Sequence, residues 1–172
     1  MSGLPELVSE IDRAAATAPT LIELQQSIVD LIGNNLDYYS WVGFYMLDPE
    51  DRSVLVLGPF RGAPTPHVRI PVTEGICGAA VVRGETVIVG DVLSDPRYLS
   101  CSIETQSEIV TPIRVNGRVV GEIDVDSHSP NAFQVADREF LEKCAATVGR
   151  YMQSQTNLKA IYFPRHSKTV VT

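Results

Sequence analysis

The feature that most constrains the fold is a pair of largely apolar segments, residues 108–115 and 118–126, joined by Asn116-Gly117. Asn-Gly is the strongest short signal for a β-hairpin, because a two-residue turn of the favoured hand needs a positive φ at both positions. The two segments are therefore predicted to be neighbouring antiparallel strands. Strands joined in this way form an antiparallel sheet, around which the rest of the chain can be interpreted.

The second of these strands carries acids at alternate positions, Glu122, Asp124 and Asp126. Successive side chains of a strand point to opposite faces, so the three acids share one face and the aliphatic residues between them share the other. One interpretation is a solvated outer face. The other is a binding or catalytic site, because the hairpin brings Glu108 close to these acids. Convergent carboxylates bind a cation, or one of them becomes a proton donor of raised pKa.

Hydrophobic periodicity predicts the sheet's other strands and its cover. The expected helices are residues 4–16, 20–34, 75–83 and 136–152, and the other strand-like or extended segments are 41–47, 53–57, 67–71 and 86–89. Thr20, with Glu23 three residues later, has the pattern of a helix N-cap. We expect an α+β fold with the terminal helices on one face of the sheet. Two long loops, 58–66 and 90–106, would cover a ligand pocket on the other face.

Length and composition limit the classes of protein to consider. The 172 residues are enough for one domain, predicted over 1–154 with a C-terminal tail over 155–172. A net charge of −7 without any Lys/Arg cluster argues against nucleic acid or anionic membranes as partners. No apolar run has the length of a membrane span and no signal-peptide pattern occurs, so a cytoplasmic location is expected. Metal-site Cys/His spacings are missing too, so neither a metal nor another cofactor is expected.

Two cysteines lie in unusual stretches of the sequence. Cys77 is in the first turn of the predicted helix 75–83, where the helix dipole would stabilise a thiolate; it could equally be a small buried hydrophobe. Cys101 lies in a polar loop, where a packing role is less natural, and Cys144 lies on the apolar face of the last helix and is assigned to the core. If Cys77 and Cys101 converge at one pocket near the acids, they are suited to redox chemistry on a small charged molecule.

Two aromatic residues, Trp41 and Tyr45, share a face of their predicted strand, with Gly43 between them. Packing in the core would explain them. An aromatic wall for a small ligand is the alternative.

Taken in order, these segments resemble the free methionine-(R)-sulfoxide reductases, single-domain members of the GAF superfamily. The matching segments are 39–45, 57–60 with Gly62, 68–71, 75–78, 91–92, Cys101, 107–110 and 123–127. The resemblance is dense over roughly 37–127 and weak in the flanking helices. It implies a GAF-like fold and a thiol-dependent oxidoreductase that acts on free methionine sulfoxide.

The resemblance also implies the roles of individual residues. The catalytic cysteines of the family fall on Cys77 and Cys101. The residues that would bind the substrate are Glu108, Asp124, Asp126, Trp41 and Tyr45. A thiolate would attack the sulfoxide sulfur and become a sulfenic acid, a second thiol would form a disulfide with it, and a thioredoxin-like reductant would restore both thiols. Cys101 is the preferred nucleophile because it lies beside Glu108, with Cys77 resolving; the reverse order stays open.

The chain departs from the family at one position. Members often carry a third redox cysteine just before the Val-Arg-Ile-Pro segment, and here that residue is His67. His67 could stabilise a thiolate or move a proton, or be a plain polar loop residue. The departure keeps two alternatives open, a non-catalytic GAF module that binds a small ligand and a redox switch. Pairing of two chains through the terminal helices would give a homodimer.

Overall fold

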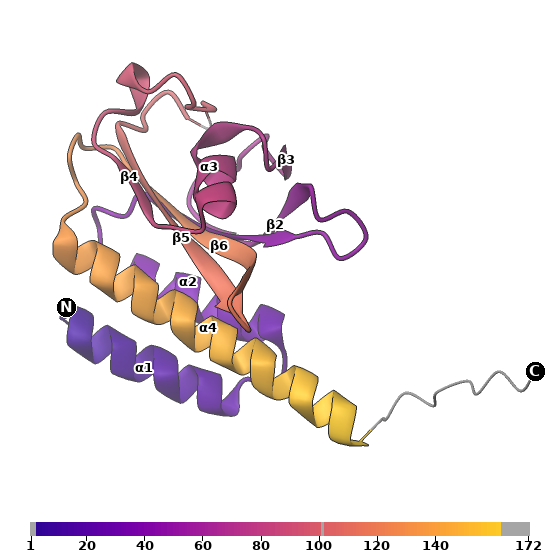
Figure 1. Cartoon of the computed structure of the whole chain (residues 1–172). Coiled ribbons are helices and arrows are strands. Elements are labelled where there is room, and N and C mark those ends of the chain that lie inside the picture. Colours follow the sequence, from indigo (N-terminus) through magenta and orange to yellow (C-terminus); the bar gives the residue numbers. More distant parts are fainter. Residues whose placement is uncertain (1–2, 101, 163–172) are drawn as a thin grey trace, which may run out of the picture.

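The computed structural model describes residues 3–100 and 102–162, with side chains described up to residue 156. The helices are α1 (Leu4–Thr17), α2 (Leu21–Asn35), α3 (Gly75–Arg83) and α4 (Val135–Tyr162), with a short 3₁₀ turn, η1, over Val92–Ser94. The strands are β1 (Trp41–Leu47), β2 (Val54–Arg61), β3 (Arg69–Pro71), β4 (Val87–Val89), β5 (Ser107–Val115) and β6 (Arg118–Ser127). The order of elements agrees with the prediction (Figure 1).

The strands form one six-stranded sheet in the order β3-β2-β1-β6-β5-β4, and every pair of neighbours is antiparallel. The hairpin of β5 and β6 lies in it, and its turn residues Asn116 and Gly117 have φ values of 51° and 76°. Both are positive, as the two-residue turn requires. The pairing sets Glu108 directly opposite Asp126, so the predicted approach of the two acids is confirmed.

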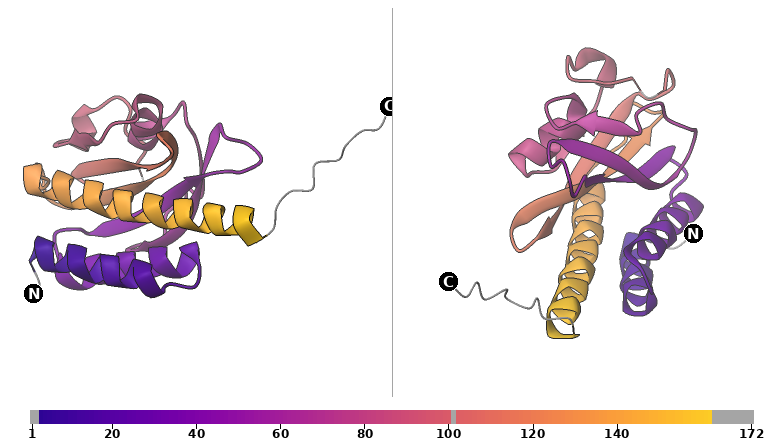
Figure 2. Two further views of the ribbon diagram at one scale, coloured as in Figure 1. Left: turned by 60° about the horizontal axis from the view of Figure 1, so that its bottom comes forward. Right: turned by 90° about the vertical axis from the view of Figure 1, so that its right-hand side faces the viewer.

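Three long helices, α1, α2 and α4, cover one face of the sheet, and α3 with the connecting loops covers the other (Figures 1 and 2). The aliphatic side chains of β6, Ile123 and Val125, are fully buried on the helical side, in one cluster with Phe44 and Phe140. This is the larger of two apolar clusters. The second lies between the sheet and α3. The prediction that the terminal helices share one face is confirmed.

Local sequence signals set two helix boundaries where they were expected: Thr20 begins α2 and Gly84 ends α3. The Thr20 hydroxyl accepts a hydrogen bond from the Glu23 backbone N–H at 3.2 Å, and donates one to the Glu23 carboxylate at 2.7 Å. The first of these bonds satisfies one of the free N–H groups at the start of α2, and the second holds the capping side chain in place. Gly84 closes α3 with a φ of 66°, a conformation that glycine adopts without steric cost.

Two boundaries differ from the prediction. β2 continues to Arg61, through Gly58 and Pro59, which were expected to be in a loop. The pairing of β1 with β2 is irregular there, and such a bulge accommodates a proline, which has no N–H to donate to the neighbouring strand. The last helix runs to Tyr162 rather than residue 152, so the predicted domain end at 154 falls inside α4.

Residues 163–172 of the predicted tail lie outside the described residues. No helix in the described part of the chain is long and apolar enough to pass through a bilayer.

Candidate active site

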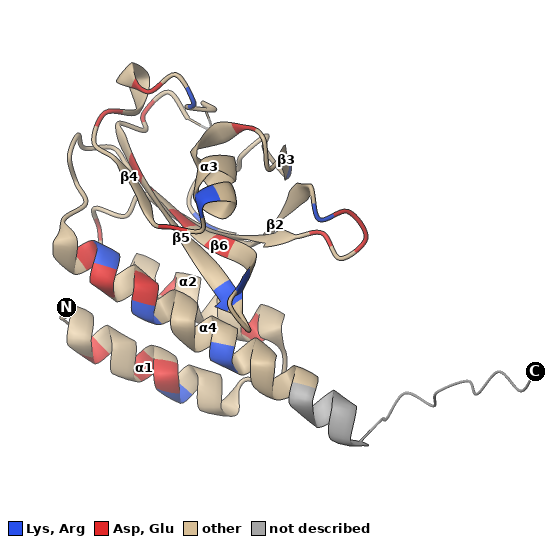
Figure 3. Cartoon of the chain, viewed as in Figure 1, with Lys and Arg blue, Asp and Glu red and all other residues tan. Residues whose placement is uncertain are grey.

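Four carboxylic acids lie on the face of the sheet opposite the long helices. Glu122 is 0% exposed, Asp124 3%, Asp126 5% and Glu108 6%. The interpretation of a solvated outer face is therefore wrong, because α3 and the loop before β5 cover these side chains. Figure 3 shows the acidic positions in the middle of the sheet, whereas the other charged residues lie mainly on helices and turns. Buried acids are rare unless they are paired or functional.

Strand register brings Glu108, Asp124 and Asp126 together. Glu108 on β5 pairs with Asp126 on β6, and Gly43 on β1 pairs with Asp124 on the other side. Gly43 has no side chain, and a Cβ atom there would collide with the ring of Trp41. The glycine thus lets the indole lie across the strand towards the acids.

Trp41 and Tyr45 form an aromatic wall beside the acids. Their ring centroids are 6.3 Å apart, and Trp41 also stacks on Phe60 at 5.6 Å. The Trp41 indole N–H donates to the Ala63 carbonyl at 3.1 Å, and the Tyr45 hydroxyl donates to the His67 carbonyl at 2.7 Å. The loop after β2 therefore holds both rings in place. The rings also pack in the apolar cluster under α3, so the core and ligand-wall interpretations are compatible.

Cys77 lies in the first turn of α3 and points at the acids. Its thiol donates a hydrogen bond to Asp124 Oδ2 at 3.6 Å, and the residue is 6% exposed. Burial, followed by the nearby charges of Asp124, Glu122 and Glu108, raises the pKa of this thiol well above its usual value. The expectation of a thiolate stabilised by the helix dipole is wrong for the ligand-free site, because burial and negative neighbours outweigh the dipole.

Burial raises the pKa of all four acids, and neighbouring acids raise the pKa of three of them further. Burial is the largest cause for each, and the charge of a neighbouring acid adds to it at Glu108, Glu122 and Asp124, so the pKa of each of these three lies well above the usual range. Burial raises the pKa of Asp126 to about 7, against the lowering effect of a hydrogen bond with Thr105. Both oxygens of Glu122 and Oδ1 of Asp124 lack a hydrogen-bond partner among the described residues. The site thus needs protons or a cation to offset its negative charge.

The loop of residues 90–106 covers this end of the sheet, but Cys101 lies outside the described residues. Its neighbours are placed: the His67 ring nitrogen Nε2 lies 3.1 Å from the Ser100 carbonyl oxygen, and the Tyr98 hydroxyl donates to the Ser102 carbonyl at 3.2 Å. Leu99 packs against Gly75 at the start of α3, two residues before Cys77. The segment that precedes Cys101 therefore approaches the element that carries Cys77.

A small cavity of about 60 Å³ adjoins the acids. Among the residues that line it are Trp41, Asp126, Thr105 and Glu104. Sequence reasoning missed Thr105, which is 2% exposed and bonds to Asp126. It lies in a loop with no hydrophobic period, so no sequence signal could have singled it out.

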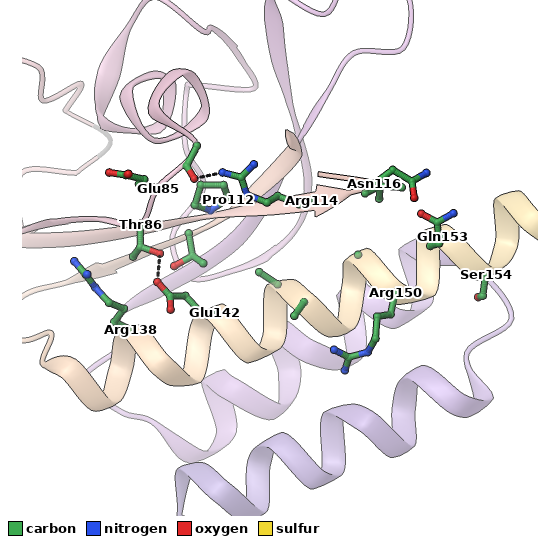
Figure 4. Close-up of a pocket in the computed structure, with 16 residues that line it drawn as sticks. Glu85, Thr86, Pro112, Arg114, Asn116, Arg138, Glu142, Arg150, Gln153 and Ser154 are labelled. Carbon is green, nitrogen blue, oxygen red and sulfur yellow. Dashed lines mark hydrogen bonds between the residues drawn. The ribbon is translucent and has the colours of Figure 1, made fainter. Parts of the chain in front are cut away.

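A larger groove of about 970 Å³ lies elsewhere, between α4, the end of β5 and the turn before β4 (Figure 4). None of the predicted site residues lines it. Its polar groups are partly bonded within the protein: the Thr86 hydroxyl donates to Glu142 at 2.7 Å, and the Arg114 guanidinium donates to the Gly84 and Gly117 carbonyls. The chemistry-bearing side chains are those on the opposite face of the sheet.

Comparison with known proteins agrees with this geometry. The GAF domain family profile matches residues 20–152. Protein YtsP of Bacillus subtilis is 42% identical over 118 residues, 69% of this chain and 71% of that protein. The free methionine-R-sulfoxide reductase of Escherichia coli is 34% identical over 122 residues, 71% of this chain and 72% of that enzyme. The free methionine-R-sulfoxide reductase of Neisseria meningitidis, solved in complex with its substrate, superposes with a TM-score of 0.84 at 30% identity, over 90% of this chain and 91% of that one.

Proposed function

This chain belongs to the GAF domain family and, within it, to the free methionine-R-sulfoxide reductases, and we propose that it reduces free L-methionine-(R)-sulfoxide to L-methionine with its own thiols. The observation that carries this proposal is the group of buried acids beside an aromatic wall and a thiol. A free amino acid offers a positive ammonium group to such acids. A peptide-bound residue offers only an uncharged amide.

The acids have two tasks in this proposal. Asp124, Asp126 and Glu108 bind the ammonium group, whose positive charge favours their ionised forms. An acid that keeps its proton at neutral pH donates that proton to the sulfoxide oxygen, which makes the sulfur electrophilic. Trp41 and Tyr45 contact the apolar side chain of the substrate.

The chemical step transfers two electrons from a thiol to the sulfoxide. A cysteine thiolate attacks the sulfur of the protonated sulfoxide, methionine leaves, and the oxygen stays on the enzyme as a sulfenic acid. A second thiol then displaces that oxygen as water and forms a disulfide. Two thiols of an external dithiol, such as thioredoxin, supply the electrons that reopen the disulfide.

We assign Cys101 as the nucleophile and Cys77 as the resolving thiol. The raised pKa of Cys77 argues against this thiol as the first nucleophile, because a buried thiol that keeps its proton reacts slowly. The approach of Leu99, two residues before Cys101, to the start of α3 supports disulfide formation between the two. His67 approaches the same loop at Ser100, where it could position the segment that carries Cys101.

The first experiment tests the substrate. In an NADPH-coupled thioredoxin assay, free methionine-(R)-sulfoxide should be consumed, whereas its N-acetylated form should not react measurably. Uncharged amides would leave the buried acids without a partner, at a cost of about 1–3 kcal/mol or more. Equal rates on both compounds would contradict the assignment of the acids.

The second experiment separates the roles of the thiols. One equivalent of substrate should produce a Cys77–Cys101 disulfide, visible by mass spectrometry of a non-reduced digest. Cys101→Ser should release no methionine, while Cys77→Ser should release about one per chain and then stall with thioredoxin. Cys144→Ser is the matched control and should turn over normally. If Cys77→Ser releases no methionine and Cys101→Ser releases about one per chain, the roles of the two thiols are exchanged.

One observation favours a second function, a GAF module that binds a small ligand without turnover. His67 stands where many family members have a redox cysteine, so the chain has one thiol fewer with which to recycle. Binding of free methionine sulfoxide without any methionine release would support this alternative. A disulfide that forms with oxidants but not with substrate would indicate a redox switch instead.

A further inference from the structure

Three potential metal ligands meet at the floor of the site from three different elements. The Cys77 sulfur on α3, a Glu108 oxygen on β5 and an Asp124 oxygen on β6 all lie within 4.8 Å of one another. The sulfur is already 3.6 Å from Asp124 Oδ2. All three residues are buried, so the ligand atoms are held by the packing of the sheet against α3.

Glu122 provides a second, independent observation. It is fully buried on the same face, and neither of its oxygens meets hydrogen-bond geometry with another described residue. It lies two residues before Asp124 on β6, so its side chain is on the same face of the sheet as the proposed ligands. A folded protein rarely leaves a buried carboxyl group without a partner, because the lost solvation costs free energy. A bound cation would give this carboxyl group a partner of opposite charge.

We propose that Cys77, Glu108 and Asp124 form a binding site for a divalent transition metal ion, with zinc as the chemistry that fits best. Zinc accepts one thiolate together with carboxylate oxygens, whereas magnesium and calcium require oxygen ligands alone. With zinc–ligand bonds of about 2.0–2.3 Å, tetrahedral ligand atoms lie roughly 3.5 Å apart. The Cys77–Asp124 distance already fits this geometry, and the Glu108 oxygen has only a short distance to move.

The fourth position is open to water or to Glu122. Binding takes the thiol as thiolate, so each metal ion bound releases the Cys77 proton to solvent. The site does not rest on the proposed reduction of methionine sulfoxide, because it uses the ligand-free arrangement. If both hold, the metal occupies the resolving thiol and two of the substrate's acids, so the metal-bound form is inactive.

Cobalt is the probe, because Co²⁺ occupies zinc sites and reports its ligands by absorption. The reduced, metal-free full chain is titrated with Co²⁺ under anaerobic conditions. One equivalent should produce a thiolate-to-cobalt charge-transfer band and the visible d–d bands of a four-coordinate site, and Zn²⁺ should abolish both. No charge-transfer band at saturating Co²⁺ would overturn the proposal.

Variants assign the ligands. The chain has three cysteines, so the Cys101→Ser/Cys144→Ser double variant leaves Cys77 as the remaining thiol and should keep the band. Cys77→Ser should lose it, and Glu108→Gln should keep it but bind Co²⁺ at least about tenfold more weakly. Circular dichroism of the metal-free variants checks that each is folded. Should Cys77→Ser fold and keep the band, or the double variant fold and lose it, Cys77 is not the ligand and the proposal is wrong.

Discussion

Two places in this molecule bury carboxylic acids, and they treat them in opposite ways. Asp137, at the start of α4, is 4% exposed and fully engaged: the Tyr38 and Tyr39 hydroxyls donate to Oδ1 at 2.6 and 2.9 Å, and the Gln134 backbone N–H donates to Oδ2 at 2.7 Å. On the other face of the sheet, Glu122 is just as buried, yet neither of its oxygens reaches strict hydrogen-bond geometry with a described residue, and only a weak donor, the Cys77 thiol, interacts with it.

The difference separates a structural acid from acids kept for a ligand. Asp137 caps a helix and joins it to the segment before β1, and its bonds exist without any ligand. Burial and the Asp137 charge raise the pKa of Tyr39, so its hydroxyl remains a donor. On β6, burial and then the charge of a neighbouring acid raise the pKa values of Glu122 and Asp124, and a bound cation would offset these charges. Four predictions follow the comparison, in decreasing order of effect.

Removing the structural acid should have the largest effect on stability. Asp137→Ala leaves two tyrosine hydroxyls and one backbone N–H without their acceptor, so we expect the free energy of unfolding to fall by about 3 kcal/mol. Urea denaturation measures this loss. Activity per folded molecule should stay unchanged, because Asp137 is on the helical side of the sheet. A loss below about 1 kcal/mol would mean that the bonded acid is not structural after all.

Asp124→Asn should have the opposite pattern: activity should fall while stability is kept. The variant removes a charge that burial opposes, so the ligand-free protein should be as stable as the unaltered protein or slightly more stable. The loss of an ionic partner for the substrate should lower kcat/KM by roughly 10- to 100-fold, or about 1.4–2.8 kcal/mol. Steady-state kinetics and urea denaturation of the same preparation measure the two effects. Unaltered kinetics together with lower stability would mean that Asp124 is a structural acid, as Asp137 is.

The pH dependence of stability should show the raised pKa of the buried acids directly. Asp126 has a pKa of about 7 when folded, above the value of about 3.9 expected for an unfolded Asp. Between these values the folded chain holds a proton that the unfolded chain has released, so stability falls as pH rises. We expect ligand-free protein to be about 1–2 kcal/mol more stable near pH 5.5 than near pH 8.

Thermal or urea unfolding over this pH range measures the effect, and Asp126→Asn is the matched control. The variant should have a shallower dependence. Greater stability at the higher pH, with no ligand present, would contradict the raised pKa of these acids.

The smallest effect is expected outside both groups of acids. His67→Ala removes the contact with the Ser100 carbonyl from a partly exposed loop, so the free energy of unfolding should change by only about 0.5 kcal/mol. The rate at which iodoacetamide alkylates Cys101 should change more clearly, because His67 contacts the residue next to it. Alkylation of a Cys77→Ser/Cys144→Ser background isolates this thiol. An unchanged rate would make His67 a plain loop residue.

The sequence alone determined the elements with strong local signals. The Asn116-Gly117 turn, the Thr20 cap and the Gly84 end of α3 depend on a few adjacent residues, so they could be predicted without knowing the rest of the fold. The alternation along β6 was of the same kind. A period of two places acids on one face and aliphatic residues on the other whatever the strand later packs against.

The tertiary structure decided which face of β6 is covered and therefore which role its side chains have. Alternation cannot say which face is covered, so only the packing of α3 and the loop before β5 turned the acids of β6 from a solvated stripe into a buried group. The same packing reversed the expectation for Cys77, since a local helix dipole is readable from sequence whereas burial and charges from distant strands are not. The Thr105–Asp126 bond and the run of β2 through Pro59 likewise depend on neighbours remote in the chain. Electrostatics and burial are properties of the assembled fold, which is why local sequence patterns alone do not determine them.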